Sequence, residues 1–194
     1  MNPMDTEPFP IHNYEEEEKT IVSVGRLEPQ KNQSLLIDAF SLIQDQLPDY
    51  RLVIYGEGHL REQLEEQIRK KNLQNCVFLP GVKKEIQDYI KKASLFVLSS
   101  NYEGIPNALI EAMAIGLPCI STDCSPGGAR ELIQHEKNGL LVPCGDADKL
   151  VTAMEEMILN RKLAIECGKN ALEIRKRVES SAIAKEWLSY LKNE

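Results

Sequence analysis

Short apolar runs alternate with longer amphipathic segments along most of this 194-residue chain, and this alternation restricts its fold more than any other feature. The apolar runs are of strand length, and the segments between them carry apolar residues at helical spacing. The runs that predict strands are 20–24, 51–55, 77–79, 95–98, 119–121 and 140–142. Strands and helices that alternate in this way predict an α/β fold, a doubly wound parallel sheet flanked by helices.

Turn and capping residues place the helices between these strands. Asn32 is a suitable N-cap for a helix that ends before Pro48, and Pro106 fits the first position of a helix that reaches about Ile115. Shorter helices are predicted over 60–71, 84–92 and 129–134, and three helical stretches over the rest of the chain. The first 19 residues differ, because they contain prolines and a run of glutamates. We interpret 1–19 as a linker or arm, with 13–19 as a solvated tail, and 20–194 as one domain.

Charge and composition exclude several classes of partner. The formal net charge is −7, with 30 acidic and 23 basic residues, whereas nucleic acids and anionic membranes attract basic faces. We therefore expect no nucleic-acid partner, although a few placed cations can still bind a phosphate. The five cysteines form no CxxC pair, and no apolar run is long enough to cross a membrane. The sequence predicts a cytoplasmic protein with reduced cysteines and no metal site.

The loop that follows the first predicted strand is the first candidate ligand site. In doubly wound sheets, ligands bind beyond the carboxyl ends of the strands. Gly25 allows a sharp turn, and Arg26 and Lys31 offer a guanidinium fork and an ammonium charge for a phosphate group. Taken alone, both cations are equally consistent with solvated loop charges.

A second candidate loop, 99–106, leads into the helix that begins near Pro106. Glu103 lies in this loop, and Glu111 follows eight positions later inside the helix, among small and apolar neighbours. A carboxylate can accept hydrogen bonds from two vicinal hydroxyls of a sugar or a ribose. The N–H groups of Gly104 and Ile105 could face a diphosphate between the two carboxylates. An exposed helix acid is the alternative for Glu111, but its small and apolar neighbours predict a well-buried helix, in which a lone acid requires a partner.

Other motifs are weaker. The segment 56–58 (GEG) lacks the third glycine of a dinucleotide fingerprint, so we interpret it as a tight strand-to-helix turn. The segment 126–128 (PGG) is best read as a loop, and the three histidines stand apart from one another.

Together the loops resemble a known family. The runs VGRLEPQKN, VIYGEGHLREQLE, FLPGV and SSNYEGIPNALIEAMAIGLPCISTDCSPGGARELI resemble the C-terminal domain of the retaining glycosyltransferases of family 4. These enzymes have the GT-B fold, with Rossmann-like halves, and the resemblance extends over about residues 20–193. Its signature is two glutamates separated by seven residues, here Glu103 and Glu111, together with the upstream Arg26 and Lys31.

The resemblance implies a role for each site residue. Arg26 and Lys31 would hold the donor diphosphate and stabilise the leaving group, Glu103 would contact the transferred sugar, and Glu111 would hold the ribose. Arg26, Lys31 and Glu103 are therefore the expected catalytic residues. The full set expected to bind substrate is Gly25, Arg26, Lys31, Val82, Glu103, Gly104, Ile105, Pro106, Leu109 and Glu111, with Val82 near the base.

The implied reaction transfers a sugar from a nucleotide-diphosphate sugar, expected to be UDP-linked, to an acceptor hydroxyl with retention and without a metal cofactor. The segment 2–5 (NPMD) resembles an interdomain linker, and a C-terminal helix with Ile183, Ala184, Trp187 and Tyr190 resembles one that returns to a first domain. We therefore expect an N-terminal acceptor-binding domain as the missing partner, and an inactive isolated chain. Any peripheral contact with the inner face of a membrane would be made through that missing half.

The segment DCSPGGARE departs from the commonest family pattern and resembles members that act on lipid-linked or surface-polysaccharide precursors. Two alternatives to a transferase stay open at this point. One is a nucleotide-sugar epimerase of GT-B fold, and the other is a non-catalytic domain that binds sugar nucleotides.

Overall fold

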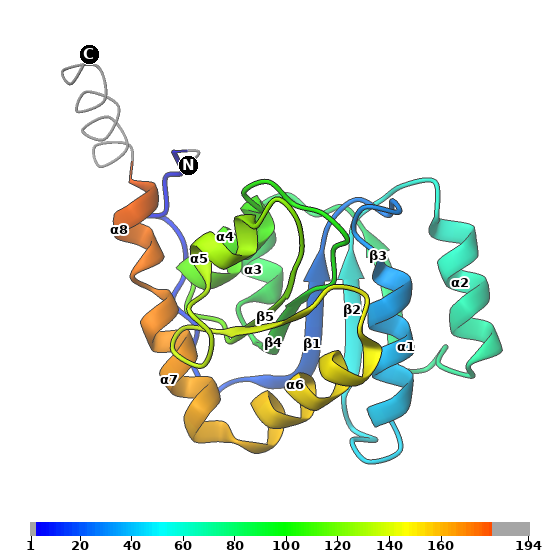
Figure 1. The fold of residues 1–194 in the computed structure, drawn as a ribbon. Helices are drawn as coiled ribbons and strands as arrows, with labels where there is room; N and C mark the ends of the chain where they lie inside the picture. The colour runs from blue at the N-terminus through cyan, green and yellow to red at the C-terminus, as the bar shows by residue number, and fades with distance from the viewer. Residues whose placement is uncertain (1–2, 180–194) are drawn as a thin grey trace.

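A computed structural model describes residues 3–179, and its single sheet has six parallel strands. The strands run in the order β3-β2-β1-β4-β5-β6 (Figure 1). Their bounds are β1 Glu18–Val24, β2 Arg51–Tyr55, β3 Val77–Gly81, β4 Ala93–Leu98, β5 Cys119–Asp123 and β6 Leu140–Pro143. The expected doubly wound parallel sheet is confirmed, with each predicted strand present and most of them extended by one or two residues.

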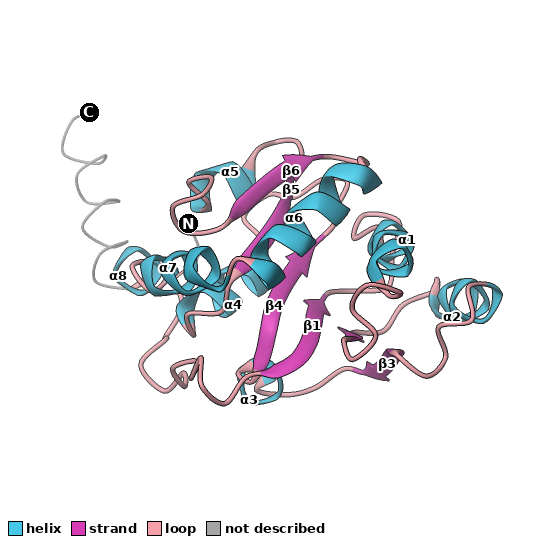
Figure 2. Ribbon diagram, turned by 90° about the horizontal axis from the view of Figure 1, so that it is seen from below, coloured by secondary structure: helices cyan, strands magenta, loops and turns pink. Residues whose placement is uncertain are grey.

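Helices cover both faces of this sheet (Figure 2). Their bounds are α1 Gln33–Ile43, α2 Arg61–Lys70, α3 Ile86–Ile90, α4 Asn107–Ala114, α5 Gly128–Leu132, α6 Ala147–Leu159, α7 Arg161–Ala171 and α8 Ile174–Val178. Adjacent residues of β1 belong to different cores, because successive side chains of a strand point to opposite faces. Ile21 belongs to the core that includes residues of α1, α2 and α6, whereas Val22 belongs to the core that includes residues of α3, α4 and α5.

The strand order decides where a ligand can bind. The chain leaves β1 for β2 on one side and later returns to β4 on the other side of β1, so the order reverses between β1 and β4. In doubly wound sheets, ligands bind at such a switch point, in the crevice beyond the carboxyl ends of the strands. The loops after β1 and β4, with the helix α4 that follows the second loop, carry all the predicted site residues except Val82, which follows β3.

Two expectations need correction. Pro106 is the N-cap of α4 with an extended conformation, φ −79° and ψ 105°, and not its first helical residue. The interpretation of 13–19 as a solvated tail is also wrong, because Glu18 and Lys19 belong to β1 and Tyr14 donates a hydrogen bond to Gly116 O at 2.7 Å. We call residues 3–17 the N-terminal segment, which runs beside α7 and α8 (Figure 1).

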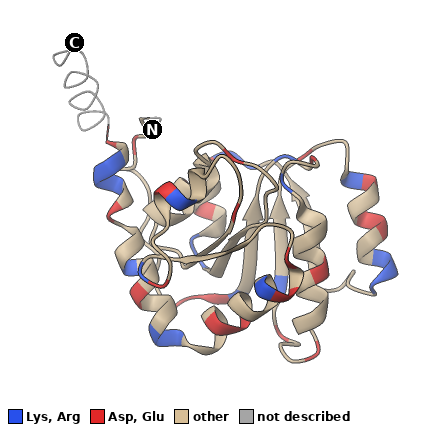
Figure 3. Cartoon of the chain, in the orientation of Figure 1, with Lys and Arg blue, Asp and Glu red and all other residues tan. Residues whose placement is uncertain are grey.

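Charged residues are interspersed along the helices rather than gathered on one face (Figure 3). Many are paired with a residue three or four positions away, such as Arg61 with Glu57 and Glu65. None of the helices in the described part of the chain combines the length and apolar content needed to cross a membrane. The five cysteines are free thiols. The predicted C-terminal residues Ile183, Ala184, Trp187 and Tyr190 lie outside the described residues.

Candidate functional site

The loop after β1 is held in place by the turn after β2. The N–H of Gly25 donates to Tyr55 O at 2.9 Å, and that of Leu27 donates to Glu57 O at 2.9 Å. A Cβ on Gly56 would lie 1.9 Å from Gly25 O, and one on Gly58 would lie 2.3 Å from Leu27 O. The two glycines of the GEG motif are therefore required for close backbone packing, which agrees with its interpretation as a tight turn.

Arg26 and Lys31 differ in their surroundings. Arg26 is exposed, and its Nη2 donates to Gln30 Oε1 at 3.2 Å. The aliphatic stem of Lys31 lies over Gly25, where an added Cβ would be 3.2 Å from it, and the side chain is only 16% exposed. Asn32 follows in a left-handed conformation and accepts from Leu35 N, as predicted for the N-cap of α1. Lys31 is thus a fixed charge, whereas Arg26 has freedom to move towards a ligand.

The loop after β4 holds Glu103 inside the protein. Glu103 is 5% exposed, and its N–H donates to Ser125 O at 3.0 Å. Its Oε1 accepts from Ser100 Oγ at 2.7 Å. A Cβ on Gly128 would lie 1.3 Å from Gly104 O, so the PGG motif packs directly against this loop. The PGG motif thus supports the backbone beside Glu103.

Hydrogen bonds join the loop after β1 to the loop after β4. Asn101 donates two of them, from its N–H to Gln30 O and from its Nδ2 to Pro29 O, both at 2.8 Å. Ser99 Oγ donates to the carbonyl oxygens of Lys31 and Asn32 at 3.1 and 3.0 Å. The two loops therefore form one continuous wall of the crevice.

Lys31 and Glu103 form an ion pair across this wall. Lys31 Nζ lies 2.5 Å from Glu103 Oε1, and the two side chains are 16% and 6% exposed. Glu103 Oε2 accepts no hydrogen bond from the described residues. We predicted both residues for the site but not their contact, because 72 residues separate them. The one sequence signal for this contact was that the two loops follow two of the predicted strands and so lie at the same edge of a parallel sheet.

Glu111 lies in the second turn of α4 and is half-buried. Burial raises the pKa of its carboxyl above the ordinary value. No hydrogen bond or ion pair to this carboxylate is formed within the described residues, so its polar capacity is free for a ligand. Leu109 differs from the other predicted residues, because its side chain is fully buried in the core and its N–H donates to Pro106 O. It fixes α4 on the sheet and presents no side chain to the crevice.

Val82 lies at a separate pocket on the β2–β3 side of the site. The pocket has a volume of about 220 Å³, and Val82 is 68% exposed at it. It is lined by Val24, Gly25, Arg26, Tyr55, Gly56, Glu57, Val82, Lys83 and Ile86. The structure thus brings Val82 next to Gly25 and Arg26, as the predicted site requires.

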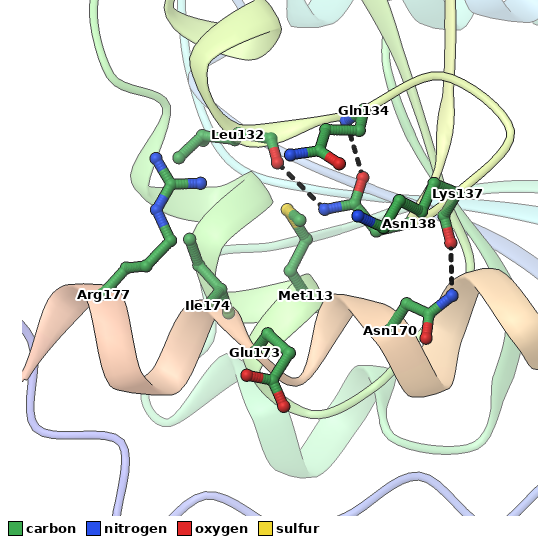
Figure 4. Close-up of a pocket in the computed structure, with 9 residues that line it drawn as sticks. All are labelled: Met113, Leu132, Gln134, Lys137, Asn138, Asn170, Glu173, Ile174 and Arg177. Atoms are coloured by element: carbon green, nitrogen blue, oxygen red, sulfur yellow. Dashed lines mark hydrogen bonds between the residues drawn. The ribbon is translucent and has the colours of Figure 1, made fainter.

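A further pocket of about 160 Å³ is lined by residues of α4, α7, α8 and the segment 132–138, and it contains none of the predicted site residues (Figure 4). Two of its amide side chains are already used, because Asn138 Nδ2 donates to Leu132 O at 3.1 Å and Asn170 Nδ2 donates to Lys137 O at 2.7 Å. The crevice beside the joined β1 and β4 loops therefore remains the candidate site.

A parallel sheet of this order, with cations and a buried carboxylate at its switch point, defines a Rossmann-like domain suited to a phosphate-containing ligand. The chain belongs to the family of glycosyl transferases group 1, whose model matches residues 4–174. The fold is that of a GT-B glycosyltransferase half, and relatives of the chain act in glycan synthesis.

Three similar proteins illustrate the relationship. The first is the N-acetylgalactosamine-N,N'-diacetylbacillosaminyl-diphospho-undecaprenol 4-alpha-N-acetylgalactosaminyltransferase of Campylobacter jejuni, 34% identical over 174 residues, which are 90% of this chain and 47% of that protein. A TarM variant from S. aureus, in complex with fondaparinux, alpha-GlcNAc-glycerol and UDP, has a TM-score of 0.88 at 28% identity. The match covers 96% of this chain and 38% of TarM.

The third is the C-terminal domain of a glycosyl transferase group 1 family protein from Francisella tularensis, with a TM-score of 0.79 at 21% identity. It matches 90% of this chain and 97% of that domain, and it shows the fold alone. The chain spans less than half the length of the Campylobacter enzyme and of TarM.

Proposed function

We propose that this chain is the donor-binding half of a hexosyltransferase that moves a sugar from a UDP-linked donor to an acceptor hydroxyl with retention of configuration. The observation that carries the proposal is the Lys31–Glu103 ion pair, which lies beside Arg26 at the switch point of the sheet. The complex of TarM with UDP supports the nucleotide, since TarM has the same fold over 96% of this chain.

The two cations would act on the donor diphosphate. Lys31 is already held by Glu103, so a diphosphate would share or take over its ammonium group, and exposed Arg26 would close on the same charge. Both would stabilise the negative charge that develops on the departing nucleoside diphosphate. Glu103 keeps its Oε2 free within the described residues, and this oxygen would accept hydrogen bonds from the transferred sugar.

Glu111 and the Val82 pocket would hold the nucleoside. The half-buried Glu111 carboxylate, which is free of partners among the described residues, suits the two vicinal hydroxyls of a ribose. The pocket beside Val82 adjoins Arg26, so a base placed there would direct its phosphates towards the cations. The N–H groups at the start of α4, with the backbone at 104–106, would face the same phosphates.

The donor chemistry would need no metal ion. Arg26 and Lys31 supply the positive charge that a divalent cation otherwise brings to a diphosphate. Within residues 3–179, no group of three His, Cys, Asp or Glu side chains is arranged to hold a metal. UDP binding should therefore be equally tight with excess EDTA and with added Mg²⁺. Binding that requires the metal would contradict this part of the proposal.

The acceptor would bind to a second, N-terminal domain, and the product would be a surface polysaccharide or a glycolipid. The Campylobacter relative, whose name includes a diphospho-undecaprenol, supports an acceptor of this class. A cytoplasmic site of action, at the inner face of a membrane in the whole enzyme, follows from this acceptor. On this proposal the 194-residue chain binds the nucleotide but transfers no sugar.

Calorimetry of the 194-residue chain with UDP, UDP-sugars and GDP-sugars tests the proposal. We expect UDP to bind and Lys31→Met to weaken it by about 10- to 100-fold, since hydrogen bonds to charged groups contribute about 1.5–3 kcal/mol. Lys19→Met is the matched control, because Lys19 is exposed and pairs with Asp49 outside the site. Equal UDP binding by the wild type and Lys31→Met would overturn the assignment. Sugar transfer by the purified chain would overturn the need for a second domain.

A further inference from the structure

The C-terminal end of α4 is closed first by its own residues. Gly116 adopts a positive φ of 83°, and its N–H donates to Met113 O at 3.0 Å. The N–H of Leu117 donates to Ala112 O at 3.1 Å. These two bonds form a Schellman motif, which satisfies carbonyls of the last helical turn. The carbonyls of 114–116, which follow, need donors from elsewhere.

All three of these carbonyls receive a hydrogen bond from a distant part of the chain. The bonds are Arg175 Nε to Ala114 O at 2.5 Å, His12 N to Ile115 O at 2.7 Å, and Tyr14 Oη to Gly116 O at 2.7 Å. Two of the donors belong to the N-terminal segment and the third to α8. The helix that carries Glu111 is therefore capped by both ends of the described chain.

Arg175 joins α4, α8 and the N-terminal segment. Besides Ala114 O, its guanidinium donates to Phe9 O at 3.0 Å and to Pro10 O at 3.3 Å. Burial lowers the pKa of Arg175. A cation at this position is also favoured by the negative end of the α4 dipole. A guanidinium presents several donors in a rigid fork, so a lysine could not make the same set of contacts.

The Tyr14 hydroxyl occupies space that is free because Gly168 of α7 has no side chain. A Cβ on Gly168 would lie 2.3 Å from Tyr14 Oη and 2.4 Å from Gly116 O, so a larger residue there would separate the hydroxyl from its acceptor. Arg161 donates to the carbonyl of Tyr14 and pairs with Glu17. The N-terminal segment is thereby held on both sides of its contact with α4.

We propose that the N-terminal segment and Arg175 position α4 from its far end, and that Tyr14 and Arg175 are positioning residues for the nucleotide site. The inference rests on the proposed function, in which Glu111 holds the ribose. α4 has eight residues, which corresponds to about 12 Å of helix. Glu111 lies one turn before Ile115, so a displacement of the capped end moves the Glu111 carboxylate.

Two measurements test the inference on Arg175→Lys and Tyr14→Phe. Hydrogen exchange should be faster in α4 and unchanged in α1, and the Kd for UDP should rise by about 3- to 10-fold, as expected for the loss of one hydrogen bond. Arg177→Lys is the matched control, because Arg177 lies on the same helix but donates to Glu131 O of α5. It should change neither the exchange of α4 nor the Kd.

A double-mutant cycle with Glu111→Gln separates positioning from general destabilisation. If Arg175 acts through Glu111, Arg175→Lys should weaken UDP binding in the wild type and have little further effect in Glu111→Gln. Equal effects in both backgrounds, or unchanged exchange in α4, would overturn the inference while UDP binding itself stands. No binding of UDP by the wild type would instead overturn the proposed function, and the positioning role with it.

Discussion

Removal of the Lys31 ammonium tests how far the site depends on its ion pair. In Lys31→Met the carboxylate of Glu103 keeps its bond from Ser100 Oγ at 2.7 Å but loses the cation 2.5 Å away. Glu103 is 6% exposed at its side chain, so water cannot replace the ammonium fully. Removing one partner of a buried pair costs about 3–5 kcal/mol. We expect the lower end, about 3 kcal/mol, because the serine hydroxyl remains.

Glu103→Gln and the double variant complete the test. Glu103→Gln leaves an amide oxygen for Lys31, whose side chain is 16% exposed, so its cost should be about 1 kcal/mol. The double variant removes both charges and should cost about 2 kcal/mol, less than Lys31→Met alone, because a coupling energy of about 2 kcal/mol offsets part of the two single costs.

Thermal and urea unfolding measure these differences. For a chain of this size, 3 kcal/mol corresponds to a fall in Tm of about 6–12 °C. Calorimetry should show that Glu103→Gln, although it lowers stability, leaves UDP binding unchanged or tighter. The reason is that the carboxylate no longer competes with UDP for the Lys31 ammonium. A loss below about 1 kcal/mol in Lys31→Met, or a double variant no more stable than Lys31→Met, would refute the reasoning.

Three further predictions concern the rest of the site. Burial raises the pKa of Glu111, so its ionised form destabilises the folded state near neutral pH, and this cost disappears below about pH 4. Glu111→Gln should therefore raise Tm near neutral pH and leave it unchanged in acid, whereas an equal gain in acid would show that burial of the charge is not the cause. Gly128→Ala should destabilise by more than about 2 kcal/mol in urea unfolding, because its Cβ would lie 1.3 Å from Gly104 O, whereas Gly104→Ala, with open space around its Cβ, should be mild. Arg26→Ala should weaken UDP binding in calorimetry but change stability by less than about 0.5 kcal/mol, because Arg26 is exposed.

The local elements of this fold could be read from the sequence because their signals are local. Strand β2 spans the predicted 51–55, and Asn32 caps α1 as its side chain suggested. The candidate site residues could also be named, since ligands bind beyond the carboxyl ends of strands and the family resemblance singled out charged residues in two of the loops there. The role of each site residue toward the diphosphate, the sugar or the ribose came from the family resemblance, and these individual roles remain proposals.

Tertiary packing decided what no local pattern encodes. The strand order placed the loops after β1 and β4 side by side, and only then did Lys31 meet Glu103 across 72 residues of sequence. The same packing turned the glutamate-rich residues 13–19, predicted as a solvated tail, into part of a segment that caps α4 through Tyr14. The composition of a segment indicates how well water solvates it when it is isolated. Its position in the folded domain depends instead on which unpaired backbone carbonyls the other elements leave within its reach.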